Sequence, residues 1–299
     1  MNNKILKALR EPYYTCMYAL YLGNFNKMSD KKYLEMEFKH RMKKVLDLEN
    51  PITFNEKLQW LKLYDRNPQY TSLVDKYEVR KFVEEKIGEE YLIPLFGVWT
   101  DFSDINFEKL PNKFVLKTTH DSGGVVICQN KQEFDIDKAK EKINKSLKNN
   151  YFYAGREWPY KNVKPKIICE ELLETDNGEL PNDYKFSCFN GSVDNVMVAI
   201  ERNTGKPKFY FFDNEWQLLR YNVSGLNASS DFTLPRPKNI KKMFDVASIL
   251  SEKFPYVRVD LYYEKDKIYF GELTFYPQSG FDSNLLPETD LLFGSMINL

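Results

Sequence analysis

The sequence predicts an α+β fold in which antiparallel β-sheets pack with helices. Three stretches, 113–128, 182–200 and 256–280, each resemble two strands joined by a short turn, which is typical of hairpins. Residues 1–98 instead carry helix-capping signals and apolar residues at three-to-four spacing. A helical beginning followed by hairpins with helices between them indicates the α+β class.

The composition is that of a globular chain with a sizeable core. Of its 299 residues, 42% are hydrophobic, and 43 Lys and Arg balance 43 Asp and Glu. This neutrality argues against a general nucleic-acid binder. Four cysteines without a CxxC pair favour reduced thiols in a cytosolic protein, and two histidines argue against a histidine zinc site.

No segment reaches the roughly 18 consecutive apolar residues of a membrane span. The apolar stretch 13–22 is short, polar in places and without a small-residue cleavage site, so we do not interpret it as a signal peptide. An aromatic N-terminal helix that docks on the domain, or that rests on a membrane surface, stays open.

The helical beginning is expected to contain three segments. Residues 1–50 are predicted to be helical, with Asp30 as a cap before apolar residues at helical spacing, namely Leu34, Phe38, Met42 and Val45. Residues 53–56 form a capping box for a second helix. Residues 72–75 open a third helix, which carries Lys76 and Arg80 near its start.

The hairpin 113–128 joins two apolar strands through a loop of small residues. Lys117 stands directly before the loop, and Gly123 and Gly124 form its tip. Backbone N–H groups in such a loop can wrap phosphates, and glycine permits close approach. Taken alone, the stretch favours an ordinary hairpin turn.

The middle of the chain offers two weaker signals. Residues 151–165 are aromatic and basic and include Arg156, which suits either an ordered surface loop or a loop closing over an anionic or sugar-like substrate. Residues 166–173 resemble a buried strand that ends in Glu170 and Glu171, which suits a hinge for adenine and ribose. In the hairpin 182–200, Asp183, Lys185 and Ser187 alternate onto one face.

The hairpin 256–280 carries the clearest chemistry. Arg258 and Asp260 share one face of the first strand, and Glu272 and Thr274 share one face of the second. Two carboxylates brought together repel each other unless a cation lies between them. Oxygen ligands of this kind suit Mg²⁺, so we favour a metal site over a hairpin with a merely solvated charged side.

The order of these motifs resembles the ATP-grasp superfamily, and in detail its TupA-like branch, associated with teichuronopeptide and other surface-polysaccharide biosynthesis. The resemblance covers about residues 50–285. It rests on the stretches ITFNEKLQWLK, DKYEVRKFV, FVLKTTHDSGG, EWPYKNVKPKIICEELL, DYKFSCFNG and RVDLY…GELTFYPQSG. It implies an ATP-grasp fold with a nucleotide cleft between two α+β subdomains.

The resemblance implies roles for residues on the nucleotide side. Arg80 and Lys117 match the basic positions that hold the ATP phosphates, and Lys117 is also expected to act in catalysis. The phosphate loop corresponds to Ser122, Gly123 and Gly124. The adenine hinge corresponds to Glu170, Glu171, Leu172 and Leu173, and Glu179 is expected to reach the ribose. Asp121 stands where glycine is common, which would stiffen the loop or repel phosphate.

On the acceptor side, Asp260 and Glu272 match the Mg²⁺ carboxylates and Arg258 the basic group beside the reaction centre. Thr274 stands where the family usually has asparagine as a further metal ligand. The acceptor is expected to meet Arg156, Lys185, Arg202, Ser279 and Gly280.

By resemblance, the chain is a cytoplasmic bacterial ligase that uses ATP and Mg²⁺ to join a small-molecule or glycan carboxylate to an amine through an acyl phosphate. The expected acceptor is a uronic acid of a capsular or cell-wall polysaccharide precursor. The expected division is a helical region 1–98, a small lid subdomain 99–172 and a large subdomain 173–299. The alternatives are a kinase that stops at phosphoryl transfer and a non-catalytic nucleotide-binding protein of a glycan assembly complex.

Overall fold

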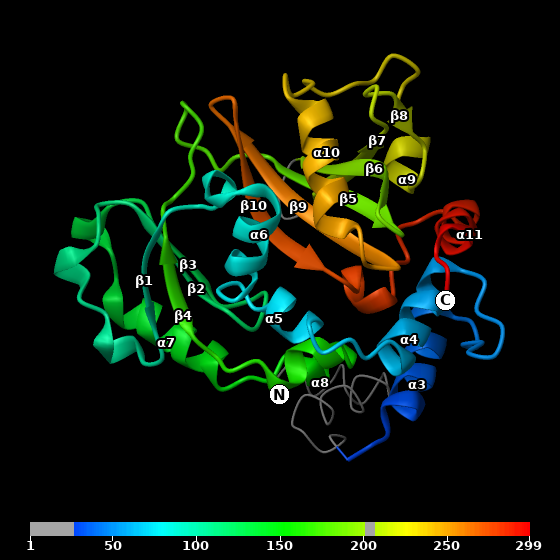
Figure 1. Cartoon of the computed structure of the whole chain (residues 1–299), viewed down its shortest axis with the longest axis horizontal. Helices are drawn as coiled ribbons and strands as arrows, with labels where there is room; N and C mark the ends of the chain where they lie inside the picture. Colours follow the sequence, from blue (N-terminus) through cyan, green and yellow to red (C-terminus); the bar gives the residue numbers. More distant parts are fainter. Residues whose placement is uncertain (1–26, 201–206) are drawn as a thin grey trace, which may run out of the picture.

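The structure, a computed structural model, describes residues 27–200 and 207–299 as two antiparallel sheets flanked by helices (Figure 1). This confirms the α+β class with antiparallel sheets. The helical prediction for residues 1–26 and the predicted site residue Arg202 lie outside the described residues. None of the described helices is long and apolar enough to cross a membrane.

Sheet A has four strands in the order β1-β4-β2-β3. Its strands are β1 (Leu95–Trp99), β2 (Phe114–Thr118), β3 (Val125–Cys128) and β4 (Ile167–Glu170). Helix α7 (Ile136–Leu147) packs on this sheet through Ala139 and Ile143, which join a core with Phe114 and Leu116. The short helical turns around it are η2 (Phe102–Asp104), η3 (Phe107–Lys109) and η4 (Lys131–Glu133).

Sheet B has six strands in the order β10-β9-β5-β6-β7-β8. Its strands are β5 (Asp183–Phe189), β6 (Ser192–Ile200), β7 (Lys208–Phe212), β8 (Leu218–Leu219), β9 (Tyr256–Glu264) and β10 (Lys267–Thr274). Helix α10 (Ile240–Ser251) packs its buried Met243 and Ala247 against this sheet, in one core with Val257 and Val259. Because side chains alternate along a strand, Arg258 and its neighbours two residues away point to the opposite face.

The other helices pack around sheet B and in the region where the two sheets approach each other (Figure 1). They are α3 (Asp30–Met42), α4 (Phe54–Tyr64), α5 (Tyr70–Val74), α6 (Val79–Ile87), η1 (Glu89–Tyr91), α8 (Phe152–Gly155), η5 (Trp158–Asn162), α9 (Val223–Leu226), η7 (Pro277–Gly280) and α11 (Pro287–Met296). The capping box of α4 is formed as predicted by Thr53 and Glu56.

Three local expectations about the helical beginning are wrong. Ser29, and not Asp30, caps α3, because its hydroxyl accepts from the backbone N–H of Lys32. The helix ends at Met42, where Lys43 turns left-handed, so Val45 is not inward but 79% exposed. The third helix is interrupted between Val74 and Val79, and Lys76 lies in the interruption.

Strand β1 bears on the expected division of the chain. It begins at Leu95 and pairs with β4, so the expected boundary between residues 98 and 99 runs through a strand of sheet A. The division 1–98, 99–172 and 173–299 stays a proposal.

Candidate active site

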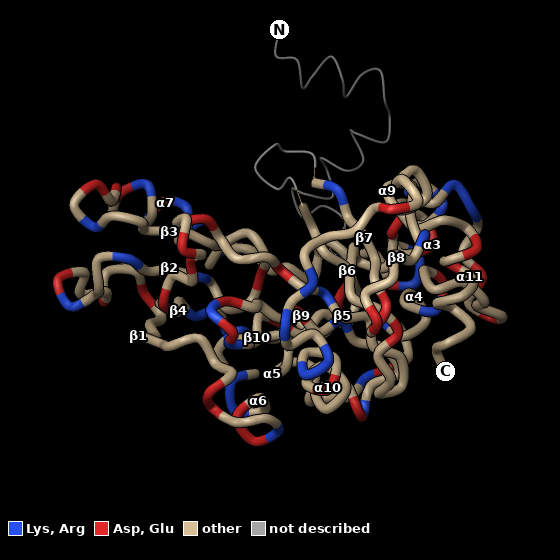
Figure 2. Tube along the Cα trace, turned by 90° about the horizontal axis from the view of Figure 1, so that it is seen from above, with Lys and Arg blue, Asp and Glu red and all other residues tan. Residues whose placement is uncertain are grey.

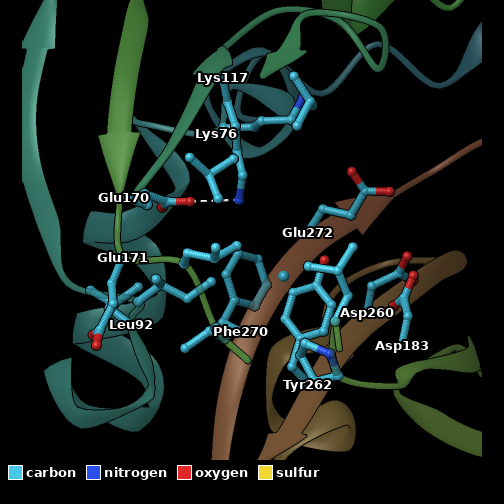
Figure 3. A pocket seen from close by; sticks show the side chains of 18 of the residues that line it. Lys76, Leu92, Lys117, Glu170, Glu171, Asp183, Asp260, Tyr262, Phe270 and Glu272 are labelled. Carbon is cyan, nitrogen blue, oxygen red and sulfur yellow. Dashed lines mark hydrogen bonds and ion pairs between the residues drawn. The ribbon is translucent and has the colours of Figure 1, made fainter. Parts of the chain in front are cut away.

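A cavity of about 360 Å³ lies between the two sheets and receives residues from both. Its volume lies in the range typical of small-molecule sites. The predicted residues that line it are Arg80, Lys117, Ser122, Glu170, Glu171, Leu172, Leu173, Lys185, Asp260 and Glu272. Figure 3 shows Glu170 and Lys117 on one side of this cavity and Glu272 and Asp260 on the other. Acidic and basic residues also lie close together where the sheets approach each other in Figure 2.

One buried carboxylate holds two basic groups on the sheet A side. Glu170, at the end of β4, accepts from Lys117 Nζ at 2.6 Å and from Arg80 Nη1 at 3.1 Å. Arg80 Nη2 also donates to the carbonyl of Ile93 at 3.0 Å. The structure thus brings the two predicted phosphate-binding cations together at the cavity wall.

The loop after β2 is held in shape by Asp121. Its carboxylate accepts from Thr118 Oγ1 at 2.5 Å, from the Gly124 N–H at 3.1 Å and from Ser146 Oγ on α7 at 2.5 Å. Burial alone would raise the pKa of Asp121, but these hydrogen bonds hold it below its usual value. A side chain at residue 124 would place Cβ 1.8 Å from Thr118 Oγ1, so this position requires glycine. Asp121 therefore ties the loop to α7.

Of the predicted phosphate-loop residues, Ser122 lines the cavity, while Gly123 and Gly124 are not among its lining residues. His120 is not among the lining residues either. Its Nε2 lies 3.1 Å from the carbonyl oxygens of Ser146 and Asn149, at the end of α7. It therefore anchors the loop to the helix instead of contacting a phosphate.

The segment after β4 presents backbone groups and apolar side chains to the cavity. The Glu171 N–H donates to the carbonyl of Pro94 at 2.9 Å. Within the described chain, the Glu171 carbonyl and the Leu173 N–H make no backbone–backbone hydrogen bond, which leaves a polar edge there. The surrounding apolar lining comes from Leu92, Ile93, Val115, Val125, Ile127, Leu172, Leu180, Tyr262 and Phe270. A flat, apolar slot with a polar backbone edge suits a nucleobase.

On the sheet B side, opposite charges are paired across three strands. Arg258 donates to both oxygens of Asp260 at 2.6 Å and to Glu272 Oε1 at 3.1 Å. Lys185 on β5 donates to Asp260 Oδ2 at 2.5 Å and also contacts Asp183. Burial would raise the pKa of Asp260, but the charges of Arg258 and Lys185 keep it below its usual value.

A β-bulge brings the two carboxylates together. The register of β10 against β9 shifts between Phe270 and Glu272, so that Glu272 pairs with Asp260 and Thr274 with Arg258. A Cβ at Gly271 would lie 2.9 Å from the Asp260 carbonyl oxygen, so glycine permits this approach.

The chain matches the TupA-like ATP-grasp family over residues 56–298, a range that includes both sheets and every residue lining the cavity. The chain belongs to the TupA-like ATP-grasp family. No protein with a curated function matches it.

Several solved structures are similar in fold. They include a D-alanine–D-alanine ligase from Bacillus anthracis, with 17% identity, a TM-score of 0.42 and coverage of 74% of this chain and 66% of that one. An L-amino acid ligase from Bacillus licheniformis has 16% identity, a TM-score of 0.45 and coverage of 76% and 49%. An N5-carboxyaminoimidazole ribonucleotide synthetase, solved as an ADP complex, has 17% identity, a TM-score of 0.43 and coverage of 74% of this chain and 50% of that one. The chain thus spans about half to two thirds of the length of these proteins.

The oxygen ligands of this ATP-grasp cavity fit Mg²⁺. No group of three or more His, Cys, Asp or Glu among the described residues forms a metal site, but Mg²⁺ commonly takes one or two carboxylates together with substrate phosphates. The contacts of Glu272 with Arg258 and Thr274 both use Oε1, which leaves Oε2 for a ligand. Within the described chain, the buried Asp183 Oδ1 has no hydrogen-bond partner. A nearby cation would stabilise both oxygens.

Other predicted residues lie elsewhere. Glu179 is in an exposed turn and is not among the residues lining the cavity. Arg156 is buried, with its guanidinium 4.6 Å from the Tyr33 ring centre and 3.6 Å from Asp30. Thr274 Oγ1 accepts from Arg258 at 3.1 Å and donates to Glu272 at 3.0 Å, so it orients both. Ser279 and Gly280 face α4.

Lys76 is a cavity residue that the sequence prediction missed. Its ammonium contacts the carbonyl of Asp121 in the loop after β2. Burial lowers its pKa, whereas the negative charges of Glu272 and Asp121 act to raise it. The signal was present in the sequence, because the DKxxxR pattern that indicated Arg80 includes Lys76.

Proposed function

We propose that this protein is an ATP-dependent carboxylate–amine ligase that works through an acyl phosphate. One observation carries the proposal: a single cavity brings the Lys117 and Arg80 cations of the sheet A side together with Asp260 and Glu272 of sheet B, and Arg258 bonds to both of these carboxylates. No protein nucleophile is needed for this reaction, since each step transfers a group directly between substrates.

Nucleotide binding would use the slot between the sheets. The base would lie among the apolar residues beside Leu172 and Leu173 and meet the polar backbone edge. The phosphates would take Lys117 and Arg80 away from Glu170 and would lie under the loop that carries Ser122. Mg²⁺ held by Asp260 and Glu272 would supply charge neutralisation for the phosphates.

In the first step, an oxygen of the acceptor carboxylate attacks the γ-phosphorus of ATP, and the bond to the ADP oxygen breaks. In the second, the amine nitrogen attacks the acyl carbon, a C–N bond forms, inorganic phosphate leaves and the nitrogen loses a proton. Arg258 would stabilise the oxyanion of the tetrahedral intermediate. Removal of such a hydrogen-bond donor typically lowers kcat by a factor of about 10²–10³.

The acceptor class we propose is a uronic acid of a capsular or cell-wall polysaccharide precursor, and the amine an amino acid or similar molecule. Membership of the TupA-like family supports this choice. We place the protein in the cytoplasm, where ATP is available. Its free, buried cysteines Cys128, Cys169 and Cys188 are consistent with a reducing compartment.

The test incubates the purified protein with ATP, Mg²⁺ and either D-glucuronate or D-galacturonate, with and without a panel of amino acids. We expect ADP and phosphate, and an amide by mass spectrometry, only when both uronate and amine are present. Release of AMP and pyrophosphate would contradict the proposal. ADP with a stable phosphorylated uronate and no need for amine would indicate a kinase. Unchanged glycans in cells carrying Asp260→Asn and Glu272→Gln would favour a non-catalytic protein.

A further inference from the structure

The turn η7 contains three successive residues in the left-handed region. Gln278, Ser279 and Gly280 have φ of 51°, 54° and 64°. Only glycine adopts this conformation at little cost, so Gln278 and Ser279 store backbone strain that neighbouring contacts must offset. The turn begins at Pro277, three residues after the end of β10 at Thr274, and therefore leads away from the paired carboxylates.

A buried ammonium holds this turn from α4. Lys62 is 1% exposed and donates to the carbonyl of Ser279 at 2.6 Å, the carbonyl of Gly155 at 2.7 Å and Gln59 Oε1 at 3.0 Å. These acceptors match the three donors of an ammonium group. Gln59 in turn donates to the Gly280 carbonyl at 2.5 Å. Two adjacent carbonyls of the strained turn are therefore fixed by one helix.

A buried carboxylate holds the same turn from the other side. Ser279 Oγ donates to Glu157 Oε1 at 2.5 Å. Burial raises the pKa of Glu157 and lowers that of Lys62 to about 7, and the opposite charges of the two groups counteract both shifts. The packing is close, since a Cβ on Gly155 would lie 2.3 Å from Ser279 Oγ.

With Ser279 and Gly280 directed inward, Gln278 is the exposed residue of the turn. It lines a second, small cavity of about 50 Å³ that also includes Arg258. The polar residues of this cavity besides these two are Ser187, Asn222, Tyr256, Asp282 and Asn284. Arg258 therefore lines the small second cavity and is bonded to Asp260, which lines the larger cavity between the sheets.

We infer that Lys62 is a positioning residue for the acceptor: it fixes the left-handed turn so that the Gln278 side chain lies beside Arg258, where Gln278 contacts the acceptor. This inference rests on the proposed function. It names Gln278 as the contact of this turn with the acceptor in place of the predicted Ser279 and Gly280, whose polar groups are bonded to Lys62, Gln59 and Glu157. Lys62 acts only through the turn and touches no reacting atom.

The experiment compares Lys62→Met with Lys57→Met. Lys57 lies on the same helix and also donates to a backbone carbonyl, that of Ile297 at 2.8 Å, but it does not touch the turn. For Lys62→Met we expect the KM for D-glucuronate or D-galacturonate to rise about 10–100-fold, as expected for misplaced substrate contacts. The KM for ATP and the Kd for Mg²⁺-ADP should stay within about twofold. Lys57→Met should leave all three constants unchanged.

A second variant keeps the test decisive if Lys62→Met does not fold. Gln278→Gly relieves left-handed strain at an exposed position, so the fold should persist, and the KM for the uronate alone should rise. Wild-type uronate KM in both Gln278→Gly and any folded Lys62→Met would overturn the inference, as would a parallel loss of ADP affinity in Lys62→Met. If the wild-type protein shows no uronate-dependent ADP release, the proposed function itself is wrong and the positioning role falls with it.

Discussion

The loop after β2 and the strands of sheet B hold their carboxylates in different ways. In the loop, the carboxylate of Asp121 accepts three hydrogen bonds from neutral donors, which come from Thr118 at the end of β2, from Gly124 of the loop and from Ser146 on α7. On the sheet B side, Asp260 is bonded to the cations Arg258, two residues away on β9, and Lys185 on β5, and Arg258 also bonds to Glu272 on β10.

The loop has a shape that is fixed before a ligand binds, whereas the ion pairs of sheet B exchange partners when a ligand binds. The hydrogen bonds of Asp121 do not have to break when a phosphate arrives, so the loop is preorganised. The ion pairs around Asp260 must be rearranged when a metal, a phosphate or an acceptor carboxylate enters, because these groups compete for the same partners. Changes on the two sides should therefore separate stability from catalysis.

The largest effect is expected from Asp260→Asn. The substitution removes the charge shared by Arg258 and Lys185 and the proposed metal ligand, so uronate-dependent ADP release should fall by at least about 10²–10³. The free energy of unfolding should fall by about 3 kcal/mol, because two buried cations lose one charged partner, while Arg258 keeps Glu272 and Lys185 keeps Asp183. Steady-state kinetics and urea unfolding measure the two effects.

The control for this variant is Asp266→Asn in the turn of the same hairpin, where the carboxylate is exposed and pairs with Lys238. It should change neither quantity appreciably. Asp260→Asn with nearly wild-type turnover would remove the assignment of the reaction centre to sheet B.

Asp121→Asn should act mainly on stability. Loss of the charge-assisted hydrogen bonds should lower the free energy of unfolding by about 2 kcal/mol, with only a few-fold rise in the KM for ATP. The pKa of Asp121 is held below its unfolded value, so its contribution is fully present above about pH 4 and is lost as the pH falls further. Urea unfolding from pH 7 to pH 3 should show the difference between wild type and variant shrinking at the acid end. A constant difference would contradict this account.

The sequence predicted the parts of this molecule that depend on local alternation and order. Arg258 and Asp260 lie on one face because strand side chains alternate, and the shared face with Glu272 was predictable from the hairpin. The bulge at Gly271, which sets the pairing of Glu272 with Asp260, could not be predicted, because one glycine in a strand does not reveal whether the register shifts.

The sequence could not predict contacts between residues that lie far apart along the chain. Arg156 was expected at the substrate, but it lies against Tyr33, whose hydroxyl donates to Ala154 across 121 positions of the chain. Nothing in the aromatic stretch 151–165 indicates that partner. The orientation of Asp121 depends on Ser146, 25 residues later, so the sequence could not decide whether this carboxylate faces the phosphates or α7.

Glu170→Gln tests whether the sheet A side also contains an exchangeable pair. In wild type, Glu170 pairs with Lys117 and Arg80, and under the proposed function the ATP phosphates would displace its carboxylate from both cations. Removing that negative charge should tighten Mg²⁺-ADP binding about 3–10-fold, even though the variant is less stable without ligand. Calorimetric titration measures the Kd. Weaker binding would mean that Glu170 orients the two cations, and Glu174→Gln, whose partner Lys113 is outside the cavity, serves as the control.

Thr274→Asn should have the smallest effect and would sharpen the contrast at the metal side. The Thr274 hydroxyl now bridges Arg258 and Glu272, which ties Glu272 Oε1 to the protein. An amide oxygen at this position would offer a further hard ligand, so the Mg²⁺ concentration that gives half-maximal ADP release should fall a few-fold while the KM for ATP changes little. Thr274→Val, which removes the hydroxyl at similar volume, should move the Mg²⁺ requirement in the opposite direction. If both variants keep the wild-type Mg²⁺ dependence, residue 274 orients Arg258 alone and the exchangeable set at sheet B is limited to the two carboxylates.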